Sequence, residues 1–399
     1  MEGATLHRNE PPVPKPLPTP RTGGVRRGDV AEVTIEKLVF GGDGLARTGA
    51  QVVFVPFAAP GDVLRIRVTE VGRGFARGAI VEIVQPGPSR RDPRCRHFGV
   101  CGGCTLQHVG YAAQVEAKAE FVRESLRRLG GIDWSGAIPV RTGAEYGYRA
   151  RAELQARRGH LGWFRAGTHE IVDVTECPVL VPEAEALLAG LREERPRHAV
   201  HIAVGDDGVA TADPRATVHR RVAGLDFEVA PDAFFQGNRV LADALVEDAT
   251  AGASGACAID LYAGAGLFSL ALARRFTRVV SVEGRRAASA QAAANAQRNG
   301  IANVEFAQQP VEEWLAAHTG SRPDLVLLDP PRAGADARAT RLIAALGASA
   351  ITYVSCDPAT LARDLRAFGA AGYRLESVVA LDMFPQTHHV ETVAKLRHA

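Results

Sequence analysis

From Ser254 to its end, the chain alternates short apolar runs with longer segments of helical periodicity. The apolar runs predict strands at residues 256–262, 278–283, 303–307, 324–329, 350–355, 374–381 and 389–396. The intervening segments predict helices at residues 266–275, 285–299, 311–318, 336–346 and 358–370. This order is typical of a Rossmann-like α/β domain, whose open sheet is covered on both faces and binds ligands beyond the carboxyl ends of its strands.

Cys356 stands where one predicted strand ends and the next predicted helix begins. Asp357 suits the helix N-cap and Pro358 suits the first helical position. The positive end of a helix dipole lowers the pKa of a nearby thiol, which favours a nucleophilic role for Cys356. A lone cysteine is more often a small buried space-filling residue, and the local pattern leaves that alternative open.

A turn containing Gly264 and Gly266 joins the first predicted strand to its helix and allows a ligand to approach the backbone. Glu283 ends the second predicted strand, where an acid can bind both hydroxyls of a ribose. These features suit either a dinucleotide or S-adenosylmethionine. A dinucleotide turn would carry a third glycine or alanine where this chain has Ser269, so the turn indicates a nucleoside cofactor and disfavours a dinucleotide.

Two more carboxylates belong to the same predicted region. Asp329 ends the fourth strand and is followed by two prolines, which predicts a stiff loop; the alternative is a turn with a capping aspartate. Glu391 begins an apolar alternating strand, where burial would raise its pKa and make it a proton acceptor. A surface glutamate on an edge strand remains the simpler alternative. We expect Tyr262, Glu283, Asp329 and Cys356 to surround one cleft.

The N-terminal part differs in composition from the rest. Residues 1–24 are rich in proline and predict an extended, disordered tail. Residues 25–88 contain short strands with glycine turns, which fit a small β-barrel of the kind that binds oligonucleotides. Residues 1–96 hold 15 Lys and Arg against 10 Asp and Glu, a net +5 in a chain of net +2. Nucleic acid is therefore a reasonable partner, although a charged solvated face explains the arginines equally well.

Cys95, Cys101 and Cys104 lie within ten residues, and Gly102 and Gly103 separate the last two. So dense a set of thiols predicts a zinc ion or an iron–sulfur cluster, with Cys177 as the best fourth ligand. Spacing alone does not separate the two, and His97 could substitute in a zinc site. The remainder of residues 89–230 is rich in predicted strands and is expected to form a mostly antiparallel central domain.

The length of 399 residues allows two or three domains. No apolar run reaches the roughly 18 residues needed to span a membrane, and six cysteines are too few for a disulfide scaffold. We therefore expect a cytoplasmic protein without membrane partners. The oligomeric state cannot be deduced, although a monomer is favoured.

Five segments in order resemble the S-adenosylmethionine-dependent RNA 5-methyluridine methyltransferases: Phe234–Asn238, Asp260–Gly266, Leu328–Gly334, Ser355–Thr360 and Met383–Glu391. Upstream, residues 25–88 are similar to the TRAM RNA-binding barrel. The whole arrangement resembles the 23S ribosomal RNA enzymes of this family. It differs from the transfer-RNA enzyme of the family, which is expected to lack both the barrel and the cluster. The methyltransferase domain would then occupy residues 231–399.

The resemblance implies a role for each matching residue. Gln236, Tyr262, Glu283 and Asp329 would contact S-adenosylmethionine, Cys356 would be the nucleophile and Glu391 the base. Cys95, Cys101, Cys104 and Cys177 would hold a 4Fe–4S cluster. Uracil C5 is a poor nucleophile, so the reaction needs a thiolate to add at C6 and a base to remove the C5 proton. The alternatives are a transfer-RNA methyltransferase, an inactive RNA-binding protein, a nicotinamide oxidoreductase and a cytosine methyltransferase.

Overall fold

The computed structural model describes residues 24–398, which form two compact units. One unit comprises residues 24–37 and 43–88, and the other comprises residues 38–42 and 89–398. The predicted proline-rich tail falls outside the described residues except for Gly24. Within the described part of the chain, no helix is long and apolar enough to cross a membrane.

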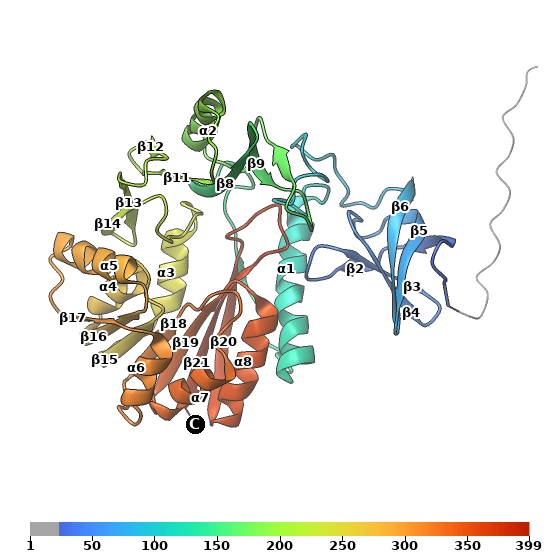
Figure 1. The fold of residues 1–399 in the computed structure, drawn as a ribbon. Helices are drawn as coiled ribbons and strands as arrows, with labels where there is room; N and C mark the ends of the chain where they lie inside the picture. Colours follow the sequence, from blue (N-terminus) through green and yellow to red (C-terminus); the bar gives the residue numbers. More distant parts are fainter. Residues whose placement is uncertain (1–23, 399) are drawn as a thin grey trace, which may run out of the picture. The chain divides into compact units, whose positions relative to one another are not determined.

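The first unit is built on one six-stranded sheet with the strand order β1-β5-β6-β4-β3-β2 (Figure 1). Its strands are β1 (Val30–Thr34), β2 (Lys37–Leu38), β3 (Gly44–Thr48), β4 (Gln51–Val55), β5 (Val63–Gly72) and β6 (Phe75–Gln85). In β5, Leu64 and Ile66 are fully buried whereas Arg67 is exposed. The alternation of apolar and polar residues in this sequence therefore matches the alternation of buried and exposed positions along the strand. β3 lacks that alternation, because Gly44, Leu45 and Ala46 are all buried, and it was not predicted.

The central part of the second unit contains a five-stranded sheet with the order β10-β9-β8-β11-β12 and a separate hairpin. The strands are β8 (Arg151–Arg157), β9 (His160–Phe164), β10 (Ile171–Asp173), β11 (Val200–Val204), β12 (Ala210–Thr211), β13 (Val218–Val222) and β14 (Leu225–Val229). All pairings are antiparallel, as expected. Helix α2 (Pro182–Glu194) was missed, although its buried Ala184, Leu188 and Leu191 have helical spacing.

The C-terminal part contains an eight-stranded sheet with the order β17-β16-β15-β18-β19-β21-β20-β7 (Figure 1). Its strands are β7 (Val140–Arg141), β15 (Gly255–Leu261), β16 (Phe276–Glu283), β17 (Val304–Gln308), β18 (Leu325–Leu328), β19 (Ala350–Ser355), β20 (Tyr373–Leu381) and β21 (Glu391–His398). The strands from β17 to β19 are parallel, and β21 runs antiparallel to both of its neighbours. The Rossmann-like α/β class is confirmed.

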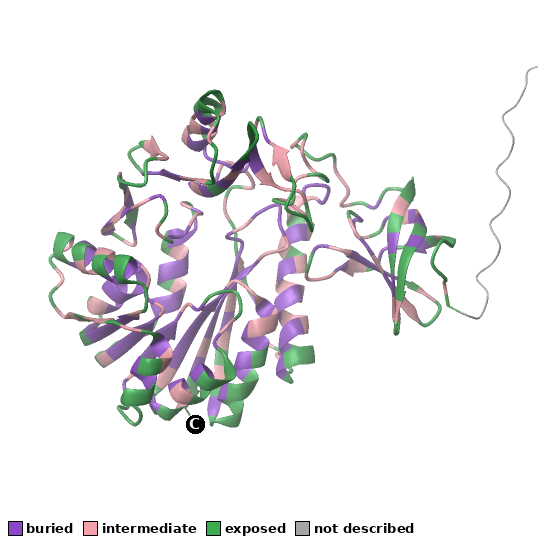
Figure 2. Cartoon of the chain, viewed as in Figure 1, coloured by how far each residue is buried: buried purple, intermediate pink, exposed green. Residues whose placement is uncertain are grey.

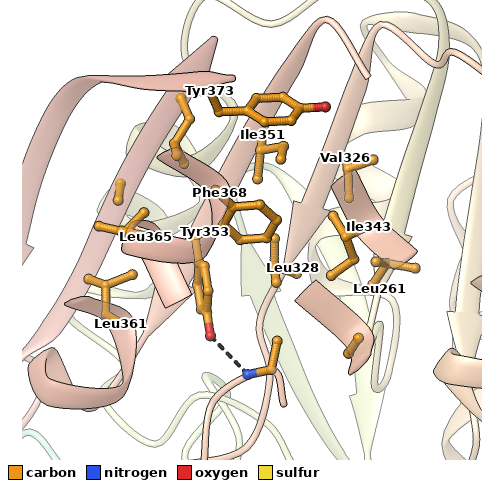
Figure 3. Packing of buried hydrophobic residues seen from close by; sticks show 14 of the residues in the cluster. Leu261, Val326, Leu328, Ile343, Ile351, Tyr353, Leu361, Leu365, Phe368 and Tyr373 are labelled. Carbon is orange, nitrogen blue, oxygen red and sulfur yellow. Dashed lines mark hydrogen bonds between the residues drawn. The ribbon is translucent and has the colours of Figure 1, made fainter. Parts of the chain in front are cut away.

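Helices cover both faces of this sheet, and its strands are largely buried (Figure 2). The helices are α1 (Tyr111–Ser125), continued by a π-helical turn (Leu126–Gly130), α3 (Ala242–Thr250), α4 (Leu267–Ala273), α5 (Arg286–Arg298), α6 (Val311–Ala317), α7 (Ala337–Ala345) and α8 (Pro358–Ala370). One apolar cluster packs α1, α6, α7 and α8 against the sheet, and a second packs α3, α4 and α5. Figure 3 shows residues of the first cluster that come from α7, α8 and the sheet. Helix α3 was not predicted. The proposed domain boundary at residue 230 stays a prediction.

Candidate active site

Four of the predicted site residues lie at one edge of the eight-stranded sheet. β15, β16, β18 and β19 are parallel, so their carboxyl ends meet at that edge. Tyr262 follows β15, Glu283 ends β16, Asp329 follows β18 and Cys356 follows β19. The structure therefore places all four residues where sheets of this class bind ligands.

Glu391 reaches the same edge from an antiparallel strand. β21 pairs with β19 so that Thr392 lies opposite Ser355. The next residue along each strand toward this edge is Glu391 on β21 and Cys356 after β19. The Glu391 side chain is only 3% exposed, and no described residue donates a hydrogen bond to its carboxylate. The strand register thus sets a buried, unpartnered acid beside a half-buried thiol.

The electrostatics of this pair favour the protonated forms of both groups. Burial and, next, the Glu391 carboxylate raise the pKa of Cys356 to about 12. Burial and Asp329 hold the pKa of Glu391 well above its usual range, and burial and Asp260 raise the pKa of Asp329. The net shift of the thiol pKa is therefore opposite to the lowering expected from the helix end alone, because burial is its largest cause.

The turn that carries Cys356 is fixed by its own side chains. Asp357 caps α8 by accepting hydrogen bonds from the backbone N–H groups of Ala359 and Thr360, each at 2.9 Å. Pro358 occupies the first turn of the helix, as predicted. The Ser355 hydroxyl donates to the Asp357 carbonyl at 3.0 Å. Cys356 is thus held in a short backbone turn that is hydrogen-bonded on both sides.

The loop after Asp329 is tied to the same turn. The Tyr353 hydroxyl on β19 accepts a hydrogen bond from the Ala335 N–H at 3.1 Å (Figure 3) and donates to Asp364 of α8 at 2.7 Å. The Thr360 hydroxyl donates to the Arg332 carbonyl at 3.3 Å. These contacts stabilise the loop and keep Asp329 and Arg332 next to Cys356.

The glycine-containing turn and Glu283 form a second group at this edge. The Glu283 carboxylate accepts hydrogen bonds from the N–H groups of Gly264 (2.9 Å) and Arg285 (2.7 Å). Each oxygen keeps a second lone pair for a ribose hydroxyl. The fully buried Ser269 donates to Asp260 at 2.5 Å, so the serine at the third glycine position supports the buried acid beneath the turn.

Gln236 comes from a different part of the chain, the segment between β14 and α3. The Gln236 side chain is buried, and the backbone carbonyl of Gln236 accepts a hydrogen bond from Arg220 at 3.5 Å. Among the described residues, the side-chain amide of Gln236 makes no hydrogen bond to Tyr262, Glu283 or Asp329. Its neighbour Asn238 donates to the Met383 carbonyl at 3.1 Å, which ties this segment to the chain just before Glu391.

The four predicted metal-ligating cysteines line one cavity of about 30 Å³. Cys95, Cys101 and Cys104 come from one loop, and Cys177 comes from the segment before α2. Within residues 24–398, no group of three or more His, Cys, Asp or Glu side chains is arranged to hold a single metal ion. The cavity therefore gathers four thiols around a common space without the geometry of a mononuclear site.

Comparison with known proteins identifies the family. A family model described as tRNA (uracil-5-)-methyltransferase matches residues 215–398, and a TRAM domain model matches residues 24–81. The 23S rRNA (uracil(1939)-C(5))-methyltransferase RlmD of Methylococcus capsulatus is 35% identical, covering 90% of this chain and 95% of its own. The chain belongs to the RNA uracil-C5-methyltransferase family.

Other similar proteins extend over the same length. An uncharacterised RNA methyltransferase of Thermosynechococcus vestitus is 33% identical over 93% of this chain and 98% of its own. The crystal structure of Pyrococcus abyssi tRNA (uracil-54, C5)-methyltransferase with S-adenosyl-L-homocysteine superposes with a TM-score of 0.71 and 28% identity, covering 92% of this methyltransferase and all of that chain. A transfer-RNA enzyme therefore shares nearly the whole architecture. The expectation that domain content separates ribosomal from transfer-RNA enzymes is wrong.

The methyltransferase has one charged site residue whose role the sequence did not indicate. Arg332 was noted only as part of the Leu328–Gly334 segment. In the structure its positive charge lowers the pKa of both Cys356 and Glu391, in opposition to burial. Its position two residues after Pro330, on a loop predicted to be stiff, was the signal that could have revealed it.

Proposed function

We propose that this S-adenosylmethionine-dependent enzyme methylates C5 of a uridine in 23S ribosomal RNA through a covalent bond between Cys356 and C6 of the base. The observation that carries the proposal is the pairing of Cys356 and Glu391 at adjacent strand ends. The reaction requires a nucleophile and a proton acceptor that reach neighbouring carbons of one ring. The adjacency of the two strand ends supports such a pair, and Asp329 and Arg332 affect its charge.

The first stage forms two bonds. The Cys356 thiolate adds to C6 of the uracil, and the electron pair of the C5–C6 double bond moves into the C4 carbonyl to give an enolate. The enolate carbon C5 then attacks the methyl group of S-adenosylmethionine. The carbon–sulfur bond of the sulfonium breaks, and S-adenosylhomocysteine leaves with that electron pair.

The second stage restores the ring. Glu391 takes the proton from C5, the resulting enolate re-forms the C5–C6 double bond, and the bond from C6 to the Cys356 sulfur breaks. The products are 5-methyluridine, the free thiolate and a protonated Glu391, which returns its proton to solvent. A buried carboxylate with a raised pKa is a strong base once ionised, which suits removal of a weakly acidic carbon-bound proton.

Substrate binding would also set the ionisation of the pair. Cys356 and Glu391 raise each other's pKa when both are charged, so the chain alone favours at most one negative charge. A sulfonium cation placed at this edge adds a positive charge next to both groups and favours their ionised forms. In this proposal Gln236, Tyr262, Glu283 and Asp329 contact S-adenosylmethionine, with Glu283 accepting hydrogen bonds from its ribose.

Replacing Arg332 with alanine is expected to move the pH dependence of methylation upward. Cys356 and Glu391 must both lose a proton, and Arg332 lowers the pKa of both. Without that charge, the pH at half-maximal single-turnover rate should rise by roughly one unit. The measurement is the single-turnover rate at saturating substrates from acid to alkaline pH. Arg332→Lys should keep the wild-type profile, and an unshifted profile in Arg332→Ala would contradict the assignment.

The four cysteines of the cavity fit an iron–sulfur cluster. We propose that Cys95, Cys101, Cys104 and Cys177 hold a 4Fe–4S cluster, since such a cluster takes one thiolate for each of its irons and needs no mononuclear geometry. The Gly103 N–H donates a hydrogen bond to the Cys101 sulfur at 3.4 Å, an interaction typical of ligating thiolates. The rest of the lining includes apolar Trp163, Val174 and Val179 together with the polar side chains of Gln107, Arg149 and Glu176. A cluster here would link residues 95–104 to the segment before α2.

RNA recognition is supported by the TRAM match and by exposed arginines of the first unit. Arg67 and Arg73 are exposed and form no ion pair with any described residue, whereas Arg77 pairs with Asp43 at 2.8 Å. Unpaired arginines are suited to phosphate contacts. The target uridine must leave its base stack to reach Cys356, so a loop or bulge is the favoured substrate.

The substrate is tested by methylation of purified RNA. Unmodified 23S ribosomal RNA and transfer RNA transcripts are incubated with the enzyme and S-adenosylmethionine, and nucleosides are identified by mass spectrometry. We expect 5-methyluridine at a single position of the ribosomal RNA. Methylation of the transfer RNA alone would favour the second candidate function, which the similarity to the Pyrococcus abyssi enzyme supports.

A further inference from the structure

The segment that delivers Glu391 to the active site has no regular secondary structure. This segment, residues 382–390, connects β20 to β21 and is here called the Glu391 loop. Met383, Gln386 and Val390 are almost completely buried, and Gln386 has a left-handed backbone with φ of 69°. Buried irregular backbone needs hydrogen-bond partners from elsewhere in the chain. Those partners decide where the Glu391 carboxylate lies.

Part of this support comes from the residues that directly follow residues 95–104, here called the cysteine loop. The backbone N–H groups of Thr105 and Leu106 donate to the Gln386 carbonyl at 3.0 and 2.9 Å. The Thr105 hydroxyl accepts a hydrogen bond from the His388 N–H at 3.0 Å. Thr105 follows directly after Cys104. The chain after the third cysteine is therefore bonded to the chain three to five residues before Glu391.

The Gln386 side chain extends the same connection to helix α1. Its amide oxygen accepts hydrogen bonds from Gln114 at 3.0 Å and from Arg91 at 3.1 Å, and its backbone N–H donates to the Gln114 amide oxygen at 3.1 Å. One turn further along α1, the fully buried Lys118 pairs with Asp382 and donates to the Phe384 carbonyl at 3.0 Å. The Glu391 loop thus has few bonds of its own and many to residues 91–118.

We propose that Thr105 and Gln386 are positioning residues that hold the Glu391 carboxylate in place for proton removal, and so couple the cysteine loop to the second stage of methylation. The inference rests on the proposed covalent mechanism. Cys356 belongs to a separate turn, fixed by Asp357 and Ser355. Loosening the Glu391 loop should therefore slow proton removal and leave the addition of Cys356 to the base intact.

The test compares Thr105→Val, which keeps the shape and removes the hydroxyl, with Thr105→Ser, which keeps the hydroxyl. On ordinary substrate RNA, Thr105→Val should turn over about 10- to 100-fold more slowly and accumulate a covalent protein–RNA adduct visible on denaturing gels. Thr105→Ser should behave like the wild type. With RNA that carries 5-fluorouridine at the target, fluorine blocks the proton-removal step, and all three proteins should form adduct at the same rate.

The results distinguish failure of the proposed covalent function from failure of the proposed positioning role. If the wild type forms no adduct with 5-fluorouridine RNA, the proposed covalent function fails. If it does, but Thr105→Val turns over at the wild-type rate without adduct, the positioning role is wrong. Equal slowing of both reactions in Thr105→Val would also overturn it, because Cys356 would then be affected as well. Gln386→Met removes the side-chain hydrogen bonds of the second positioning residue and should give the same signature as Thr105→Val.

Discussion

Replacing Cys356 with alanine is expected to reduce methyl transfer to RNA by roughly 10,000-fold or more, since the proposed nucleophile for activation of C5 is lost. Binding of S-adenosylmethionine should change little, because the groups proposed to contact it lie outside the Cys356 turn, in the segment between β14 and α3, after β15, at the end of β16 and after β18. The methylation rate is measured with radiolabelled S-adenosylmethionine, and its affinity is measured by calorimetry. Cys356 is half-buried, so loss of its sulfur should leave the fold intact.

Cys257 provides a matched control for this variant. It is also a half-buried free cysteine of the same sheet, but it lies near the amino end of β15, where its backbone N–H donates to Asp324 at 2.9 Å. Cys257→Ala should retain wild-type methylation. Methylation by Cys356→Ala at a rate close to that of Cys257→Ala would rule out the covalent mechanism.

The strand–helix order of the C-terminal part was predictable because its central strands are apolar runs. β15, β18 and β19 are buried on both faces of the sheet, so their sequences are distinct from those of the amphipathic helices between them. The carboxyl ends of parallel strands then bring Tyr262, Glu283, Asp329 and Cys356 to one edge without further information. Helix α2 was missed because it interrupts a region that is otherwise rich in strands, whereas helix α3 lies in the segment between β14 and β15 for which no element was predicted.

The proximity of Glu391 to Cys356 could not be derived in the same way. β21 is antiparallel to β19, and its register depends on pairing across the sheet and not on local sequence. The family resemblance supplied the role of Glu391, whereas the apolar alternation gave only a strand. The register also explains why the carboxylate is buried: Glu391 is paired with Leu381 on β20 and lies beside the end of β19.

The direction of the Cys356 pKa shift depends on residues that are distant in sequence and could not be predicted from the strand–helix junction alone. A helix end stabilises a nearby charge by about 0.3–1 kcal/mol, and this contribution can be predicted from the strand–helix junction. The opposing effects are burial of the thiol and the charges of Glu391 and Asp329, which come from residues distant in sequence. Only the folded arrangement reveals that these effects are larger and that Arg332 partly offsets them.

Glu391→Gln is expected to stop the reaction after methyl transfer and to accumulate the covalent adduct between Cys356 and the RNA. The amide has the shape of the acid but cannot accept the C5 proton, so turnover should fall about 100- to 10,000-fold. Adduct formation itself should proceed, because the thiol and the methyl donor are unchanged. The adduct is detected as a slowly migrating protein–RNA species on denaturing gels, and its mass should include one transferred methyl group.

The same variant should be more stable than the wild type at alkaline pH. Burial raises the folded-state pKa of Glu391 above its ordinary value of 4.5, so the folded protein binds this proton more tightly than the unfolded chain does. The wild type therefore loses stability as pH rises above about 4.5, up to the folded-state pKa. Glu391→Gln lacks this loss, and its melting temperature should exceed that of the wild type at pH 8 but not at pH 4.

Glu376→Gln is the appropriate control for both measurements. Glu376 lies on the neighbouring strand β20, is exposed, and pairs with Arg397 at 3.0 Å. Its replacement should alter neither turnover nor the alkaline melting temperature by a measurable amount, because exposed ion pairs contribute little. If Glu391→Gln turned over normally, or lost turnover without any adduct, another group would have to remove the C5 proton. The strand register would then have placed Glu391 beside Cys356 for a different reason, such as setting the charge of the thiol.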